Sequence, residues 1–423
     1  MSRQHRPMLA LSLIALVMTL LLATGAFYVA RGADPIKIGF GMALTGGLSA
    51  NGKPALLAMQ IWKDDVNKKG GLLGRQVELV FYDDQTNPST EPGIYSKLLD
   101  VDKVDFIVSG YGTNLIAPLM PIAMERKLTL VGIFGLANNE KYKYPNYFQI
   151  SPNGPDPEIS TPQGFFELAA KQNPKPQTVA IVGADAEYPQ NALVGSRELI
   201  KRFGFKTVYD KTYPPSTVDY TPIVRAIKAT NPDVVFIASY PPDSVGMLRA
   251  IHEVGLSPKM VGGGMVGLQF TSVMTSMGSM LNGIVNYDFW APESTMMFPG
   301  IKEFFAQYQP RAQKESMDPL GYYLPPYSYA AMQVLGQAIE ATKGLDQQKV
   351  ADYIRATEFS TIVGKVKFGK NGEWAQGRTL MVQYQKIQGN SVDQFRGPGK
   401  KVVLFPDEFK SGTIIYPYSA AKN

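Results

Sequence analysis

The residues of this chain that could do chemistry are glycines, hydroxyls and carboxylates that stand directly after apolar segments. The segment Gly47–Pro54 is close to a phosphate-binding loop, a pattern that requires Ser or Thr after its lysine. Pro54 takes that place, and proline offers neither a hydroxyl for magnesium nor a backbone N–H for phosphate. Gly39 and Gly41 begin a dinucleotide-binding pattern, but Leu44 stands where its third glycine belongs. Nucleotide binding is therefore disfavoured.

Metal ligands and catalytic groups are scarce. Asp83 and Asp84 follow a predicted strand and could form a metal pair, but a double aspartate there more commonly caps the following turn, which we favour. The chain has no cysteine and two histidines, His5 and His252, so thiol catalysis and thiolate metal sites are excluded and a histidine triad is disfavoured. We expect His252 to be a packing or surface residue of the helix 245–254. The sequence thus predicts no catalytic residue, no metal and no cofactor, and it argues against a hydrolase.

One segment that could hold a small ligand is Gly110–Asn114, which stands between a predicted strand and a predicted helix. Free N–H groups and the Thr113 hydroxyl at a helix start can hold a carboxylate. Thr113 can also cap its own helix, and the two roles are compatible. Tyr188 and Tyr240 lie just after later strands, although lone tyrosines are commonly packing residues. Gly262–Gly264 would let the backbone approach a ligand closely, or would make a tight turn.

The elements that must position these groups alternate between short apolar strands and helices. The first unit is a strand at 36–40, a helix with apolar residues at helical spacing and Pro54 in its first turn, and a strand at 77–82. The rhythm continues to about residue 150, is interrupted by prolines and glycines at 151–155, and resumes with a strand at 178–182. Such alternation predicts parallel sheets covered on both faces, with ligands bound beyond the C-terminal strand ends.

The first 33 residues read as a leader. Arg3 and Arg6 precede an apolar run over 8–30 that ends in small residues, which is typical of a secretory signal. The run is also long enough for an uncleaved membrane anchor, and both interpretations stay open. No cysteine follows, so a lipid-anchored lipoprotein is excluded. Without the leader's arginines the net charge of +6 falls to about +3, so neither nucleic acid nor an anionic membrane is an expected partner. The chain beyond the leader is long enough for two domains.

Three motifs resemble the periplasmic binding proteins of branched-chain amino acid ABC transporters, the leucine/isoleucine/valine-binding-protein-like family. They are Phe40–Gly47, Val66–Gly74 and Tyr82–Pro88. The order of elements resembles this family from about residue 34 to the end. The resemblance implies the type I periplasmic binding protein fold, in which two Rossmann-like lobes with parallel sheets are joined by three crossover segments.

The resemblance also implies a function. Such a protein captures a small carboxylate-bearing ligand, an amino acid or an organic or aromatic acid, as its lobes close about a hinge. It then delivers the ligand to the membrane permease of an ABC importer. We expect a monomer in the periplasm. The alternative is a membrane-tethered ligand-sensing domain of the same fold, which requires the leader to stay uncleaved.

The expected division of the chain follows from this resemblance. Residues 1–33 are the signal peptide or anchor, 34–153 and 287–363 form the N-terminal lobe, and 154–286 and 364–423 form the C-terminal lobe. The three crossovers are expected near 152–156, 283–288 and 363–368.

Ligand-binding residues are implied in the same way. After the strand 106–108, family members hold the ligand carboxylate with a hydroxyl and backbone N–H groups. A second set of contacts follows the next strand, tyrosines of the other lobe close over the ligand, and a glutamate binds the ammonium of amino acids. The corresponding residues here are Gly112, Thr113 and Asn114; Phe134, Gly135 and Leu136; Tyr188 and Tyr240; and, at the glutamate position, Gly263 and Gly264.

Two departures from the family pattern bear on the ligand. The segment Ile133–Leu136 has no hydroxyl residue where amino acid binders carry one, and Gly264 stands at the glutamate position. An ammonium buried without a carboxylate partner is costly. We therefore hypothesise an organic acid without an α-ammonium, aromatic or aliphatic. Asp185, Glu187 or Asp288 could still supply the missing charge.

Overall fold

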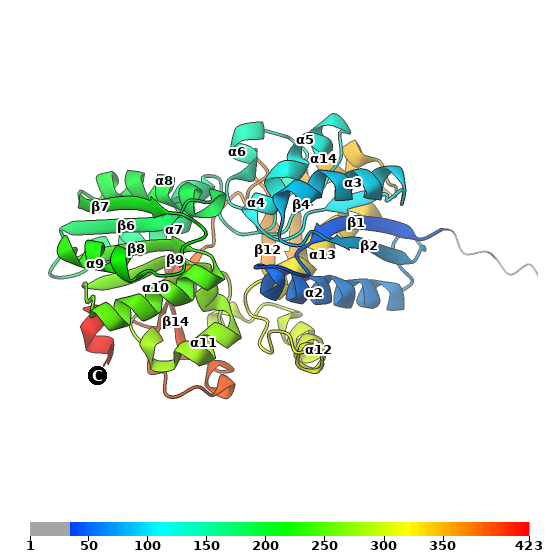
Figure 1. The fold of residues 1–423 in the computed structure, drawn as a ribbon. Coiled ribbons are helices and arrows are strands. Elements are labelled where there is room, and N and C mark those ends of the chain that lie inside the picture. The colour runs from blue at the N-terminus through cyan, green and yellow to red at the C-terminus, as the bar shows by residue number, and fades with distance from the viewer. Residues whose placement is uncertain (1–33, 423) are drawn as a thin grey trace, which may run out of the picture.

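The computed structural model describes residues 34–422, which form two α/β lobes (Figure 1). The leader lies outside the described residues, so neither interpretation of it is tested. Over the described range, none of the helices combines the length and the apolar character needed to cross a membrane.

The first lobe is built on a sheet of five parallel strands in the order β2-β1-β3-β4-β5. Side chains on both faces of the first strand are buried, as expected for a parallel sheet between two helix layers. The strands are β1 (Ile36–Met42), β2 (Val77–Asp83), β3 (Phe106–Val108), β4 (Leu130–Gly132) and β5 (Tyr147–Gln149). The helices of this part are α2 (Ser49–Lys68), α3 (Glu91–Asp100), α4 (Thr113–Ile116), α5 (Met120–Glu125) and α6 (Asn138–Tyr142).

The helix α2 begins earlier than the sequence indicated. Its opening turn forms when the N–H groups of Asn51 and Gly52 both donate to the carbonyl of Leu48, at 2.9 and 3.0 Å. Pro54 therefore lies inside the helix and not in its first turn. The loop that connects β1 to α2 is therefore shorter than the sequence indicated.

The second lobe is built on a seven-stranded sheet in the order β14-β13-β10-β9-β8-β6-β7, parallel except at the β13 and β14 edge. Its strands are β6 (Thr178–Ala184), β7 (Lys206–Tyr213), β8 (Val234–Ser239), β9 (Met260–Met265), β10 (Val285–Asp288), β13 (Leu380–Tyr384) and β14 (Lys401–Phe405). Its helices are α7 (Pro157–Ala170), α8 (Glu187–Arg202), α9 (Thr221–Ala229), α10 (Pro241–Val254) and α11 (Thr271–Met277). Two parallel-rich lobes confirm the predicted fold class.

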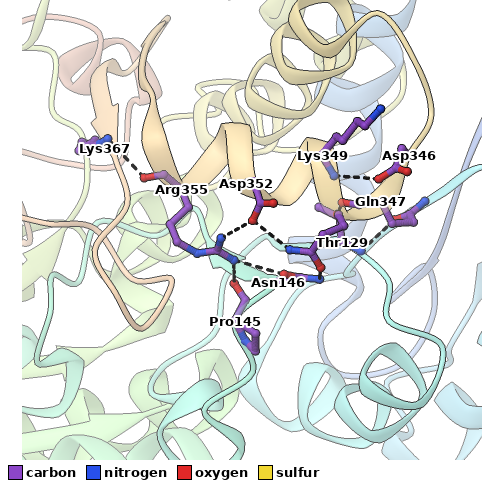
Figure 2. Close-up of polar contacts among 10 residues, drawn as sticks. Thr129, Pro145, Asn146, Asp346, Gln347, Lys349, Asp352, Arg355 and Lys367 are labelled. Atoms are coloured by element: carbon purple, nitrogen blue, oxygen red, sulfur yellow. Dashed lines mark hydrogen bonds and ion pairs between the residues drawn. The ribbon is translucent and has the colours of Figure 1, made fainter.

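The chain returns to the first lobe after β10. This returning part comprises α12 (Ile301–Lys314), α13 (Pro325–Thr342), α14 (Gln347–Ala356) and the hairpin of β11 (Glu358–Thr361) and β12 (Gly364–Lys367). In Figure 1 the helices labelled α12, α13 and α14 lie with the blue and cyan lobe. Figure 2 shows how α14 is held: the carbonyl of Gln347 accepts from the Thr129 hydroxyl at 2.6 Å, and Arg355 donates to the carbonyl of Pro145 at 2.6 Å. Both contacts reach loops that lead into strands of the first sheet.

Two crossovers differ from the expected positions. β10 pairs with β9 and β13, so the second lobe extends to Asp288 and the second crossover begins only after it. The hairpin and the loop after it cover the edge of the first sheet, where the N–H of Gln149 donates to the carbonyl of Gly372 at 2.8 Å. The N–H of Ala375 still donates to the carbonyl of Lys367 in the hairpin, and β13 begins at Leu380, so the third crossover falls between Ala375 and Leu380 and not at 363–368.

Candidate functional site

A small cavity of about 30 Å³ lies between the two lobes, beyond the C-terminal ends of strands from both sheets. Such a volume holds roughly one or two water molecules, so an amino acid or an aromatic acid enters only when the lobes part or the rings move. Among the residues that the structure describes, no charged side chain lines it. The lining residues are Tyr111, Gly112, Thr113, Phe134, Gly135, Leu136, Ser151, Asn153, Thr161, Tyr188, Tyr240, Val266, Tyr287, Phe289 and Tyr323.

Thr113 lies where the loop after β3 enters α4. The N–H of Leu136 donates to its hydroxyl oxygen at 3.0 Å, and the N-cap of α4 is Gly112, not Thr113. The capping alternative is therefore not realised, and the hydroxyl hydrogen can be donated to a ligand. Within residues 34–422, the N–H groups of Thr113 and Asn114 have no protein acceptor. One hydroxyl and two N–H groups at this place can hold a carboxylate.

The loop after β4 forms the second side of the cavity. Gly135 fits here because a Cβ would lie 1.9 Å from Oδ1 of Asn138. Its carbonyl accepts from the Ser151 hydroxyl and from Nδ2 of Asn153, both at 3.1 Å. Ser151 in turn accepts from Nε2 of Gln149 at 2.7 Å. These buried hydrogen bonds hold the loop after β4 in place. They also bring to the cavity Ser151 and Asn153, two residues that were not predicted from the sequence.

Aromatic side chains form most of the remaining wall. The rings of Phe289 and Tyr323 stack with centroids 5.9 Å apart, and Phe134 contacts Phe289 at 4.9 Å. The Tyr323 hydroxyl lies 3.5 Å from the hydroxyl of Tyr111 and 3.4 Å from that of Tyr287. Burial raises the pKa of Tyr287 to about 12 and that of Tyr111 and Tyr323 well above the usual value. These hydroxyls are therefore protonated donors at neutral pH.

Besides the contact between the hydroxyls of Tyr323 and Tyr287, two more hydrogen bonds join the lobes beside the cavity. Nδ2 of Asn191, on α8, donates to the carbonyl of Leu136 at 2.8 Å. The Tyr240 hydroxyl, at the start of α10, donates to Oδ1 of Asn114 at 3.3 Å. The lobes are thus in contact with each other in this structure.

The structure brings most of the predicted site residues to this cavity. Gly112, Thr113, Phe134, Gly135, Leu136, Tyr188 and Tyr240 line it, and Asn114 lies beside it as the partner of Tyr240. The residues that the sequence did not single out are Tyr111, Ser151, Asn153, Thr161, Val266, Tyr287, Phe289 and Tyr323.

Gly263 and Gly264 do not line the cavity. Both lie inside β9, where Gly263 has a φ of 108° and a Cβ would come within 2.2 Å of the Phe236 ring. The tight approach of the Phe236 ring explains Gly263, and the turn we considered is not formed, because both residues belong to the strand. Gly264 is connected to the cavity only through Tyr188, a lining residue whose hydroxyl donates to the Gly264 carbonyl at 2.9 Å.

None of the three acids considered for an ammonium faces the cavity. Asp185 and Glu187 are exposed, and neither is a lining residue. Asp288 is fully buried and paired with Lys401; burial raises its pKa and Lys401 opposes the rise. Its carboxylate is therefore already in use.

Asp83 and Asp84 hold their loop, since Asp83 accepts from the N–H of Leu44 at 3.0 Å and Asp84 from that of Thr86 at 2.7 Å.

Comparison with known proteins agrees with this architecture. Residues 35–389 match the profile of the family described as periplasmic binding protein, and the chain belongs to that family. A Leu/Ile/Val-binding protein homolog 8 of Brucella abortus is 23% identical over 382 residues, 88% of this chain and 91% of that protein. The relatives thus mark the branched-chain amino acid type of binding protein, as the motifs predicted.

Solved structures share the fold. A leucine-binding protein from Thermotoga maritima has a TM-score of 0.72 at 22% identity, covering 88% of this chain and 99% of that one. A solute-binding protein of an ABC transporter from Rhodopseudomonas palustris HaA2, in complex with p-hydroxybenzoic acid, has a TM-score of 0.72 at 21% identity, covering 84% and 95%.

Proposed function

We propose that this protein is an exported solute-binding protein that closes its lobes on a small organic acid without an α-ammonium and delivers it to the permease of an ABC importer. The observation that carries the proposal is the composition of the cavity wall: hydroxyl and N–H donors, aromatic rings, and no charged side chain among its lining residues. We propose that the chain acts as a monomer, which light scattering would test.

The carboxylate is bound by the Thr113 hydroxyl and the N–H groups of Thr113 and Asn114. Hydrogen bonds to a charged group contribute about 1.5–3 kcal/mol each, so a few donors can hold a carboxylate without a cation. An ammonium would find no carboxylate in this wall, and leaving it unpaired costs several kcal/mol. The same wall that accepts an organic acid therefore rejects the matching amino acid.

The body of the ligand lies against aromatic rings. One packed group of rings is formed by Phe134, Phe289 and Tyr323. A second pair of rings faces it from the other lobe: Tyr188 and Tyr240, whose centroids lie 5.6 Å from each other. Ring pairs add about 0.5–1.5 kcal/mol beyond the burial of their area, which favours an aromatic acid over an aliphatic one. The p-hydroxybenzoic acid complex of the Rhodopseudomonas palustris relative is a precedent for such a ligand on this fold.

Binding rather than catalysis is the proposed activity. The histidine of the described range, His252, is exposed on α10 and is not a lining residue of the cavity. The rings and hydrogen-bond donors of the wall bind the ligand and exclude water. Closure of the lobes about the crossovers is the proposed conformational step.

The decisive experiment compares ligands that differ only in the α-ammonium. The protein is unfolded and refolded to remove carried-over ligand, then titrated by calorimetry with phenylalanine against 3-phenylpropionate and with leucine against 4-methylpentanoate. Benzoate and 4-hydroxybenzoate complete the set, and thermal shift gives an independent reading, since stabilisation grows with the logarithm of ligand concentration. We expect the deaminated member of each pair to bind more tightly. Tighter binding of leucine than of 4-methylpentanoate would overturn the proposal.

A further inference from the structure

A second and much larger hollow lies where the two lobes meet and shares no lining residue with the cavity. Its volume is about 1160 Å³. We call it the hinge groove. Its walls are α2, α12, α13 and the β11–β12 hairpin with the loop that follows it, all on the first lobe, and the segment 406–409 of the second lobe. Its shape therefore depends on how the lobes are arranged.

Arg378 lies in the hinge groove within a cage of aromatic rings. Its guanidinium carbon is 4.8 Å from the ring centroid of Phe298, 4.8 Å from that of Trp374 and 5.7 Å from that of Phe409. The residue is only 8% exposed. Rings provide part of the stabilisation that a buried cation needs, but not a counter-charge.

The guanidinium is only partly satisfied. Nη2 donates to the Tyr327 hydroxyl at 3.3 Å and to the carbonyl of Val363. Nε is buried without an acceptor, and Nη1 has no hydrogen-bond partner within residues 34–422. Arg378 and Lys401 are the buried cations of the described range, and of the two only Lys401 has an acid within 4.0 Å. Buried charges are normally paired, so Arg378 lacks an expected anion.

The acids of the hinge groove do not supply that anion. Glu358 is paired with Lys365 at 3.2 Å, and Asp65 accepts from the Tyr329 hydroxyl at 2.9 Å. Glu303 and Glu408 also line the groove, and neither comes within ion-pair distance of Arg378 in the part of the chain described.

We propose that the hinge groove is a second binding site, which takes an organic carboxylate with an apolar body. Its carboxylate accepts from Arg378, because a planar guanidinium is the side chain best suited to carboxylates. Its body lies along Phe298, Trp374 and Phe409. The proposal is independent of which ligand the cavity binds.

Contacts connect the two sites. The Tyr327 hydroxyl, which accepts from Arg378, donates to the carbonyl of Phe289 at 2.9 Å. The Tyr327 ring also packs on Phe134, with centroids 5.4 Å apart. Phe289 and Phe134 both line the cavity. An anion on Arg378 and a ligand in the cavity thus act on the same tyrosine, and any change in affinity that one causes in the other must be reciprocal.

The test uses Trp374 as a reporter in the full chain. The protein has three tryptophans, so labelling with 5-fluorotryptophan gives three fluorine resonances, assigned with Trp62→Phe and Trp290→Phe. The probe is 4-phenylbutyrate, and 4-phenylbutanol is the matched neutral control. We expect a saturable shift of the Trp374 resonance with the acid and binding about ten-fold or more weaker with the alcohol, the loss expected for a hydrogen bond to a charged group.

Variants separate the hinge groove from the cavity. Arg378→Gln should weaken the Trp374 titration by about ten-fold or more, whereas Thr113→Val, which alters only the cavity, should change it much less. Because Arg378→Gln alters a buried cage, Ala375→Phe is the second variant: Ala375 is exposed, lines the groove and can be enlarged without touching the core. It should also weaken the titration. An unmoved Trp374 resonance, or equal shifts with the alcohol or in folded Arg378→Gln or Ala375→Phe protein, would overturn the proposal.

Discussion

The N–H of Leu136 donates to the hydroxyl oxygen of Thr113 at 3.0 Å, and this bond ties together the loops that follow β3 and β4. Because the oxygen accepts from Leu136, the hydroxyl hydrogen remains to be donated into the cavity that both residues line. One side chain therefore shapes the wall and has a donor that a ligand in the cavity can accept from. The two roles can be separated by measurement.

Thr113→Val should remove both roles. Loss of a donor to a charged carboxylate should weaken 3-phenylpropionate binding by about ten-fold or more, and the buried N–H of Leu136 left without an acceptor should lower the free energy of unfolding by about 1–3 kcal/mol. Calorimetry and urea denaturation measure the two effects. Thr113→Ser keeps the hydroxyl and is the matched control. Wild-type affinity in Thr113→Val would show that the hydroxyl does not contact the ligand.

Asn191→Ala tests the contact between the lobes. Its side chain donates to the carbonyl of Leu136 across the cleft, so its removal should disfavour the closed arrangement by about 0.5–1.5 kcal/mol, a few-fold loss of affinity. The free energy of unfolding without ligand should change little. Small-angle X-ray scattering with and without ligand reports the closed fraction. Gln190→Ala is the control, because Gln190 bonds to Asp185 within one lobe. Equal effects of the two variants would contradict a role in closure.

Much of this site could be predicted because carboxyl ends of parallel strands meet at one edge of a sheet. That rule, with the family resemblance, placed Thr113 after β3, Gly135 after β4, and Tyr188 and Tyr240 after strands of the second sheet. It failed for Gly263 and Gly264, since a glycine needed for close strand packing and a glycine beside a ligand look the same in a sequence.

Other parts of the site left weaker signals. Phe289 and Tyr323 reach the cavity from segments outside the βα rhythm, so no periodicity marks them. Ser151 and Asn153 did leave a trace: with Tyr147 and Gln149 they form polar positions at every second residue of a buried strand and its extension. The prolines and the glycine of 151–155 predict a boundary between two segments. That prediction outweighed the alternation of polar residues. The crossovers differ from the expected positions because β10 pairs with the distant strand β13, and because the loop after the hairpin bonds to Gln149 of β5.

Removing one member of the buried ion pair Asp288–Lys401 should destabilise the protein strongly, whereas replacing both members should destabilise it much less. Both side chains are at most 1% exposed, and the pair lies at the start of the second crossover. Lys401→Met leaves a carboxylate uncompensated in the core and should cost about 3–5 kcal/mol of the free energy of unfolding. The double variant Asp288→Asn with Lys401→Met should recover much of that loss, because the amide oxygen of the introduced asparagine can still accept from the N–H of Phe289, as the carboxylate does. Denaturation of the single and double variants gives the coupling energy, and simple additivity would contradict it.

Glu91 should make stability depend on pH in a specific direction. It is 1% exposed beside Asp84, and burial first, then the Asp84 charge, raises its pKa. The folded state therefore holds a proton that the unfolded chain has released once the pH exceeds the ordinary glutamate value of about 4.3. The stability from neutral Glu91 is fully present below that pH and is lost progressively as the pH rises toward the folded-state pKa. Glu91→Gln stays neutral throughout, so its free energy of unfolding should fall less than that of the wild type between about pH 5 and pH 8. Urea denaturation across this range measures the difference, with Glu303→Gln at an exposed position as the control. Parallel curves for the wild type and Glu91→Gln would mean that Glu91 is already ionised in the folded protein.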